Sequence, residues 1–231
     1  DPPLLRLASW EHADTANGVF LPRLTEGRLD ALEIGFDVAF TRNPAVSARG
    51  EGLGFALLPA DRYGDGGLAP VPTTEPNLPG ALGVGFDIHV PGGPAEARHV
   101  SLHWDGALIE ARDPGFDLVA GEANRVHIAL ERTAGGALVS LSLTPPGGGA
   151  RVEVFDRVFV GGLELTDHRM AFGAATGSRT AHHDLDAITV SAEPAAAPAP
   201  TITLGAEVSG ALAAGGAVDR HRLVLSETTL V

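Results

Sequence analysis

The 231-residue sequence lacks cysteine and lysine altogether, and each absence removes a class of function. Without cysteine, the chain has neither a disulfide framework nor a thiolate zinc site. Without lysine, its 16 basic residues are all arginines; they face 29 acidic residues, and the net charge is −13. A surface this acidic repels a phosphate backbone, which argues against nucleic acid as a partner. No stretch reaches the roughly 18 consecutive apolar residues of a membrane helix, so we expect no membrane insertion.

What the sequence does contain is an alternation of apolar with polar or small residues. The alternation recurs in five stretches, at 32–40, 82–90, 100–104, 126–130 and 139–143. Side chains on a strand point to opposite faces in turn, so this period of two indicates half-buried strands. Gly- and Pro-rich turn clusters separate the stretches, and no window has a capped helical stripe. We therefore predict an all-β antiparallel sandwich whose functional residues lie in loops.

The composition changes abruptly near residue 193, where Pro and Ala begin to alternate. Such a segment forms a stiff extended linker and no core. We predict a first domain over 1–192, a linker over 193–200, and a further β segment over 201–231. The last segment is too short to bury a core of its own, so we interpret it as the truncated start of a second β-sandwich.

Four motifs follow one another between residues 50 and 191. They are GEGLGFALLP at 50–59, LGVGFDIHV at 82–90 with HVSLHWDG at 99–106, RMAFGAATG at 169–177, and AHHDLDAITVS at 181–191. In this order they resemble the L-type lectin domain, the concanavalin A-like jelly roll of legume lectins and of many extracellular bacterial proteins. The resemblance implies a concanavalin A-like jelly-roll β-sandwich that binds a glycan or polysaccharide.

The last segment carries a second, looser resemblance. VSGALAAGGAVDRHRLVL at 208–225 resembles the opening of bacterial pre-peptidase C-terminal domains, which are secreted accessory β-sandwiches. This resemblance implies a secreted or cell-surface, multidomain bacterial parent protein whose further domains are partners of the first.

The lectin resemblance also implies a sugar site on one edge of the sandwich. The family's key carboxylate, beside a strained peptide bond, falls at Glu51, and glutamate offers the same two acceptor oxygens on a longer stem. The family's glycine backbone amide falls at a Gly-Gly pair, its specificity loop falls at 177–180, and a nearby tyrosine ring could stack on a sugar. The carbohydrate-binding candidates are therefore Glu51, Tyr63, Gly66, Gly67, Gly177, Ser178 and Arg179. A turn-capping role for Tyr63 and a solvated charge at Arg179 stay open as alternatives.

A metal site is the next expectation. If 82–90 and 99–104 are neighbouring strands, alternation lets Asp87 approach His99. In the family, a Glu two residues before that Asp shares a transition metal with the two, and an Asn binds a neighbouring calcium ion. Here Gly85 replaces the Glu and Pro91 replaces the Asn. We predict a degenerate site at which Asp87 and His99 hold calcium or a transition metal, or at which they bind no ion.

Two further features are given structural interpretations. Adjacent His182 and His183 on a strand point to opposite faces, so they cannot ligate one ion without a bulge. Trp10 and Trp104 are interpreted as core or interlayer aromatics and not as sugar platforms.

These observations favour a non-catalytic carbohydrate-binding module. One alternative is a structural or adhesive β-sandwich that has lost sugar binding, as the missing Glu and Asn suggest. A second is a glycoside hydrolase of the same fold, which would need two carboxylates about 5 Å apart in the concave groove of the sheet. The sequence has no Glu, Asp, Glu alternation on a strand and no other enzyme motif, so we do not expect an enzyme.

Overall fold

A computed structural model describes residues 4–45, 50–89, 98–196, 201–202 and 222–223. Val90 and Pro91, at the end of one predicted strand, lie outside the described residues. The chain divides into two compact units, Asp1–Ala195 and Ala196–Val231. In the second unit the description is limited to a parallel pair of short strands, β13 (Thr201–Ile202) and β14 (Arg222–Leu223). The linker and the pre-peptidase resemblance therefore stay predictions.

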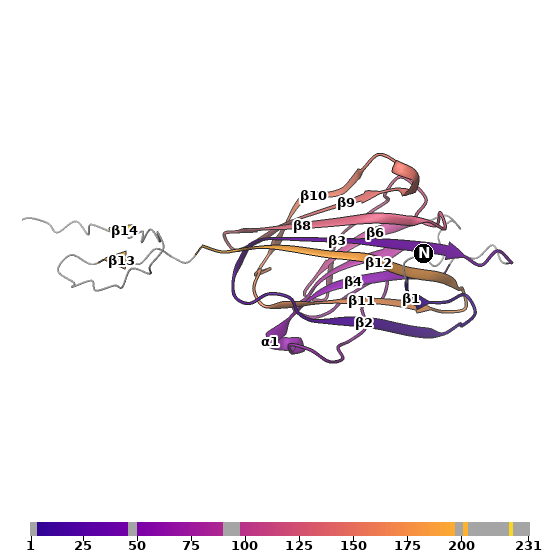
Figure 1. The fold of residues 1–231 in the computed structure, drawn as a ribbon, viewed down its shortest axis with the longest axis horizontal. Coiled ribbons are helices and arrows are strands. Elements are labelled where there is room, and N and C mark those ends of the chain that lie inside the picture. Colours follow the sequence, from indigo (N-terminus) through magenta and orange to yellow (C-terminus); the bar gives the residue numbers. More distant parts are fainter. Residues whose placement is uncertain (1–3, 46–49, 90–97, 197–200, 203–221, 224–231) are drawn as a thin grey trace, which may run out of the picture. The chain divides into compact units, whose positions relative to one another are not determined.

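The first unit consists of two six-stranded sheets that pack face to face (Figure 1). The back sheet contains, in spatial order, β1 (Leu5–Ala8), β12 (Ala181–Pro194), β3 (Leu29–Arg42), β8 (Ala123–Thr133), β9 (Gly136–Thr144) and β10 (Val152–Gly161). The front sheet contains β2 (Thr15–Arg23), β11 (His168–Thr176), β4 (Gly52–Pro59), β5 (Leu82–Asp87), β6 (His99–Trp104) and β7 (Ala107–Arg112). All pairs within them are antiparallel. The all-β prediction is confirmed.

Helical structure is limited to two short pieces in the described chain. One is α1 (Ala60–Tyr63), directly after β4, and the other is a 3₁₀ turn, η1 (Pro146–Gly148). Neither is long or apolar enough to cross a membrane.

The core lies between the two sheets and follows the predicted alternation. Phe36 of β3 lies at its centre, with ring centroids 5.8, 6.0 and 5.0 Å from those of three front-sheet phenylalanines, Phe55, Phe86 and Phe172. Each of these side chains is buried, and aromatic rings bury large apolar areas. Trp104 packs against this core, as predicted.

Residues 71–77 cross the outer face of the front sheet, and we call them the strap. They lie over a row of glycines in register on four neighbouring strands: Gly18, Gly173, Gly54 and Gly85. A Cβ on the last three would overlap the carbonyl oxygens of Pro72, Thr73 and Thr74, respectively. The strap advances about one residue per strand, and its backbone takes the space that side chains would fill.

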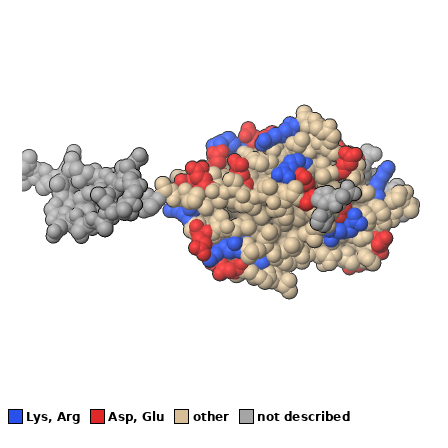
Figure 2. All heavy atoms as spheres, viewed as in Figure 1, with Lys and Arg blue, Asp and Glu red and all other residues tan. Residues whose placement is uncertain are grey.

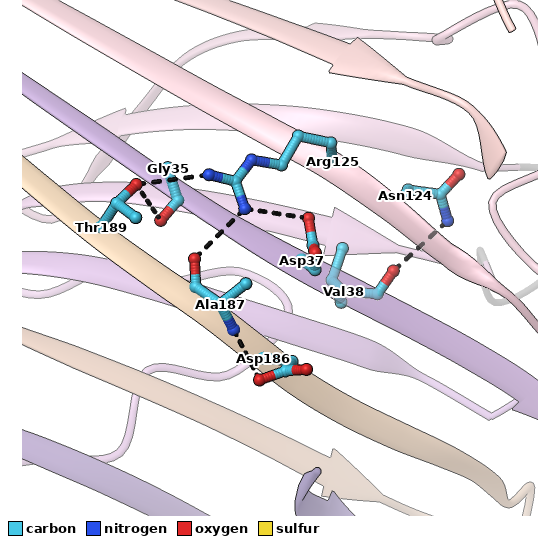
Figure 3. A network of polar contacts seen from close by, with 8 residues as sticks. All are labelled: Gly35, Asp37, Val38, Asn124, Arg125, Asp186, Ala187 and Thr189. Atoms are coloured by element: carbon cyan, nitrogen blue, oxygen red, sulfur yellow. Dashed lines mark hydrogen bonds and ion pairs between the residues drawn. The ribbon is translucent and has the colours of Figure 1, made fainter. Parts of the chain in front are cut away.

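The outer face of the back sheet carries a polar network instead (Figure 3). Arg125 Nη1 donates to Asp37 Oδ1 at 3.1 Å and to the Ala187 carbonyl at 3.2 Å, and its Nη2 donates to Thr189 Oγ1 at 3.3 Å. The register of β12 against β3 shifts between Asp186 and Thr189. Arg125 therefore satisfies a carbonyl that the bulge removes from the ladder.

Charged side chains of both signs are scattered over the drawn face of the first unit, most of which is uncharged (Figure 2). On the face drawn in Figure 2, arginines and acidic residues are interspersed, and neither sign forms a continuous patch there.

Candidate functional site

Four connections meet at one end of the sandwich, which we call the rim. Their described residues are 9–14, 50–51 before β4, 88–89 after β5, and the loop 177–180. Backbone hydrogen bonds hold them together: Ile88 N–H donates to Glu51 O at 3.0 Å, and Asp14 N–H donates to Gly177 O at 3.4 Å. The rim therefore brings together segments that are remote in sequence.

Glu51 and Gly177 are neighbours at the rim. A Cβ on Gly177 would overlap Glu51 Oε1, so the missing side chain admits the carboxylate. Glu51 itself is half-buried, and the flanking Gly50 packs against the backbone of Ala181. The described residues contain no cis peptide bond.

Arg179 reaches from the exposed end of the same loop to His89. Its Nη1 lies 3.0 Å from Nδ1 and 2.9 Å from Nε2 of the imidazole, while neighbouring Ser178 points into solvent. Burial lowers the pKa of His89, and the Arg179 guanidinium lowers it further. The imidazole is therefore neutral at pH 7. Glu51, His89 and Arg179 place an acceptor, an imidazole and a guanidinium at one rim.

Gly66 and Gly67 lie away from this site, so the prediction that all sugar-binding candidates share one edge of the sandwich is wrong for these two residues. They follow α1, at the far end of β4 from Glu51, and the 8 residues of β4 span about 26 Å. Their carbonyl oxygens accept hydrogen bonds from Arg169 at 2.7 and 2.5 Å. The side chain of Arg169 is 0% exposed, so both glycines serve to satisfy a buried guanidinium.

Tyr63 lies at the same far end. Its hydroxyl donates to the Pro79 carbonyl at 2.7 Å, and its ring packs on a small apolar cluster that includes Ala56 and Leu58. This placement favours the turn-closing interpretation of Tyr63. Only Glu51 and the loop 177–180 remain together among the predicted sugar-binding groups.

Trp10 is a rim residue that the sequence interpretation missed. Its ring stacks on His182 with centroids 3.4 Å apart, and its carbonyl accepts from Thr180 Oγ1 at 2.9 Å. The ring is half-buried and belongs to neither apolar cluster of the described residues, so the core interpretation of Trp10 is wrong. His183 points the other way, into the core beside Phe40, as alternation predicts.

The predicted approach of Asp87 to His99 is present. The two residues are cross-strand partners in β5 and β6, and a third group, Glu75 of the strap, joins them. The ligand atoms of all three lie within 4.8 Å of one another, and His99 Nε2 lies 2.8 Å from Glu75 Oε1. No periodicity marks Glu75, because it stands in a long connection without strands.

Burial has the largest effect on the pKa of Asp87. It raises the pKa of the carboxyl to about 6, although the backbone N–H of His89 donates to Oδ1 at 2.6 Å and opposes the shift. A buried carboxylate with a raised pKa gains from a cation at this position.

The strap is anchored beside these groups through His103. His103 Nε2 lies 3.0 Å from Glu75 Oε2 and 2.8 Å from Ser101 Oγ, and its Nδ1 lies 2.7 Å from Asn77 Oδ1. The imidazole is fully buried. Two polar residues of the strap are therefore tied to β6.

These residues fit one transition-metal ion better than calcium. One imidazole nitrogen and two carboxylates are ligands that zinc or manganese accepts. Calcium needs six to eight ligands, nearly all oxygen, and Pro91, where the family has an amide ligand, lies outside the described residues. Glu75 brings a carboxylate to Asp87 and His99, whereas β5 itself carries Gly85 two residues before Asp87.

No protein-family model and no curated protein sequence matches the chain. Among solved structures, the lectin from Bauhinia forficata in complex with GalNAc superposes with a TM-score of 0.63 at 14% identity, over 84% of this chain and 89% of that chain. Lectin I-B4 from Griffonia simplicifolia, in a metal-free form, gives 0.62 at 14% identity over 84% and 89%. The VIP36 exoplasmic/lumenal domain, in a Ca2+/Man-bound form, gives 0.58 at 13% identity over 81% and 77%. The chain therefore has the fold of the legume lectins, a concanavalin A-like jelly-roll β-sandwich.

Proposed function

We propose that the chain is a non-catalytic glycan-binding module and that the glycan binds at the rim. The observation that carries this proposal is the convergence of Glu51, the loop 177–180 and His89 from three remote segments. Binding residues on loops of a rigid sandwich are the usual arrangement for recognition. The Bauhinia lectin binds GalNAc and the VIP36 domain binds mannose, on the same fold.

The rim offers the chemistry that a saccharide needs. The two oxygens of Glu51 can accept hydrogen bonds from adjacent hydroxyls, and Arg179 can donate to ring or hydroxyl oxygens. Trp10 adds a half-buried aromatic ring beside the loop 177–180, since its carbonyl accepts a hydrogen bond from Thr180. A site of this kind binds weakly alone, so avidity from further domains or repeated modules would matter.

Glu51→Ala is the direct test of this site. Loss of a charge-assisted acceptor worth about 1.5–3 kcal/mol is expected to raise the Kd for a bound glycan roughly 10- to 100-fold. A glycan array identifies the ligand, and titration calorimetry measures the change. Glu193→Ala is the matched control, since Glu193 is exposed at the opposite end of β12. Equal binding by the Glu51 variant and the control would contradict the proposal.

We also propose that Glu75, Asp87 and His99 hold one transition-metal ion. When bound, the ion supplies positive charge that compensates the buried Asp87 and joins the strap to the front sheet. Glu75→Gln removes one of three ligands and is expected to weaken zinc binding at least about tenfold, as loss of even an outer-shell partner does. Calorimetry with zinc and then manganese measures this, with Glu193→Gln as control. Unchanged zinc affinity in Glu75→Gln would show that Glu75, and with it the strap, does not contribute to the metal site.

A glycoside hydrolase is the second candidate, because Glu75 and Asp87 approach within the 4.8 Å of their cluster and retaining enzymes separate their carboxylates by about 5 Å. The strap argues against it, since residues 71–77 occupy the face where a substrate would lie. Glycan hydrolysis that Asp87→Asn abolishes would favour this candidate over the binding module.

The cellular context is part of the proposal. We infer a secreted or cell-surface bacterial parent protein with a Pro/Ala linker over 193–200 and a second β-sandwich that begins at 201. The two sequence resemblances support this placement, and the VIP36 domain on the same fold is exoplasmic or lumenal. A structural or adhesive module without sugar binding is the outcome if every glycan fails to bind.

A further inference from the structure

A hollow opens at the far end of the sandwich from the rim, and we call it the far hollow. Its volume is about 350 Å3, within the range of small-molecule sites. It is lined by residues from four separate segments, among them Asp61, Arg62, Gly80, Trp104, Glu164 and His168. A neighbouring hollow of about 280 Å3 shares Gly162 and Glu164 with it, so the two form one extended depression.

Trp104 supplies an aromatic wall to the far hollow. One part of the indole packs against the core, which fixes the ring. Its N–H has no hydrogen-bond acceptor among the described residues, and the adjacent Gly162, at φ 80°, brings no side chain to the indole nitrogen. Trp104 is half-buried, and its indole nitrogen is not one of the fully buried polar atoms without a partner, so this donor is open to solvent and to a ligand. The indole is therefore a fixed donor available to a ligand.

Two exposed carboxylates and one exposed arginine surround Trp104 in the far hollow. Asp61 and Glu164 form no hydrogen bond or ion pair within the described part of the chain. Arg62 lies along Gly80, and its guanidinium is 5.9 Å from the centre of the Tyr63 ring. Two carboxylates and one guanidinium can thus accept from and donate to the same ligand.

His168 adds a further acceptor. Its Nδ1 lies 3.1 Å from the Thr166 carbonyl, which can only accept, so Nδ1 carries the proton. Burial lowers the pKa of His168, and the ring is neutral at pH 7. In this tautomer Nε2 is an acceptor, on a residue that lines the hollow.

We propose that the far hollow is a second saccharide-binding site, which takes a neutral sugar unit of an oligosaccharide. A sugar unit combines an apolar C–H face with hydroxyls that donate and accept, and the hollow combines an indole with donors and acceptors of both kinds. Within the far hollow itself, two carboxylates outweigh the single guanidinium of Arg62 and disfavour phosphate and sulfate groups, while Arg62 opposes a cationic ligand. The neighbouring hollow adds Arg28 and Arg132, and Arg132 is paired with Asp30. A site at each end makes the module bivalent, able to cross-link glycans instead of only retaining one.

The full-length chain with Glu51→Ala tests this site separately from the rim. On a glycan array this variant is expected to retain binding to at least one neutral glycan. Adding Glu164→Gln is expected to weaken the retained binding at least fivefold, whereas adding Glu193→Gln leaves it unchanged. Equal thermal unfolding of the two double variants excludes a folding defect as the cause.

The two tryptophans allow a second readout, because one lies at each end. In a Trp10→Phe chain the single remaining indole is that of Trp104. Its fluorescence is expected to change, and to reach a plateau, as the chain is titrated with a glycan that the Glu51→Ala variant still binds. Silence of Glu51→Ala on the whole array while the unaltered chain binds would overturn the second site and leave the rim proposal standing. Retained binding that Glu164→Gln does not weaken, or that is restricted to anionic glycans, would also overturn it. Binding lost in Glu164→Gln but unaffected by Glu51→Ala would overturn the rim proposal alone.

Discussion

Gly85→Ala is expected to lower the unfolding midpoint of the first unit by about 6–12 °C. The added Cβ would overlap the Thr74 carbonyl and the Ser101 hydroxyl, so either the strap or β6 must move. Overpacking costs about 1–3 kcal/mol, and the overlap with backbone places Gly85→Ala at about 3 kcal/mol, which gives this shift for a domain of this size. Thermal unfolding followed by circular dichroism measures it. Gly66→Ala is the matched control, because nothing lies within 4 Å of a Cβ at Gly66.

The variant Gly85→Glu extends this prediction to the metal site. This variant places a glutamate on β5 at the position where the lectin family has its metal-binding Glu and this chain has Gly85. From the sequence alone, the added ligand should strengthen metal binding. The strap predicts the opposite, because any side chain at Gly85 displaces Thr74 and with it the neighbouring Glu75. We expect weaker zinc binding and a lower midpoint than in the unaltered chain. Tighter zinc binding at an unchanged midpoint would show that the strap and a strand glutamate are compatible.

Stability is expected to fall by about 3 kcal/mol between pH 6.5 and pH 4 because of His183 alone. The side chain is 0% exposed, and neither ring nitrogen has a hydrogen-bond partner. Burial lowers the pKa of His183 to about 4 in the folded state, from about 6.5 when exposed. The folded state therefore binds fewer protons than the unfolded chain in this window. The stability is fully present above pH 6.5 and is lost as the pH falls toward 4.

His183→Leu is the variant that isolates this effect. Leucine has a similar volume and no polar atoms to leave unsatisfied, so the variant is expected to be at least as stable at pH 7.5 and to lose less stability at pH 4.5. Urea unfolding at the two pH values gives both free energies. His127→Leu serves as control, since that imidazole is 35% exposed. An unchanged pH slope in His183→Leu would mean that other buried histidines, such as His168, dominate acid unfolding.

The candidate site could be predicted only in part from the sequence. The contact between Asp87 and His99 follows from the sequence. The period of two gives the face of each side chain, and antiparallel pairing of the two neighbouring strands brings them opposite each other. Glu51 and Gly177 were brought together by the order of motifs in the lectin resemblance. Gly66 and Gly67 were assigned to the wrong end, since a motif alignment does not say where a long connection runs.

The sequence by itself determined the all-β architecture, the faces of the strands and the buried positions. Alternation of apolar and polar residues within a single strand is enough to show which side chains face the core. The tertiary structure alone decided that residues 71–77 lie on a row of glycines, that Glu75 joins Asp87 and His99, and that Trp10 lies at the rim. Each of these depends on contacts between segments tens of residues apart. Such contacts follow from how the two sheets and their connections pack together, and no periodicity within one segment encodes them.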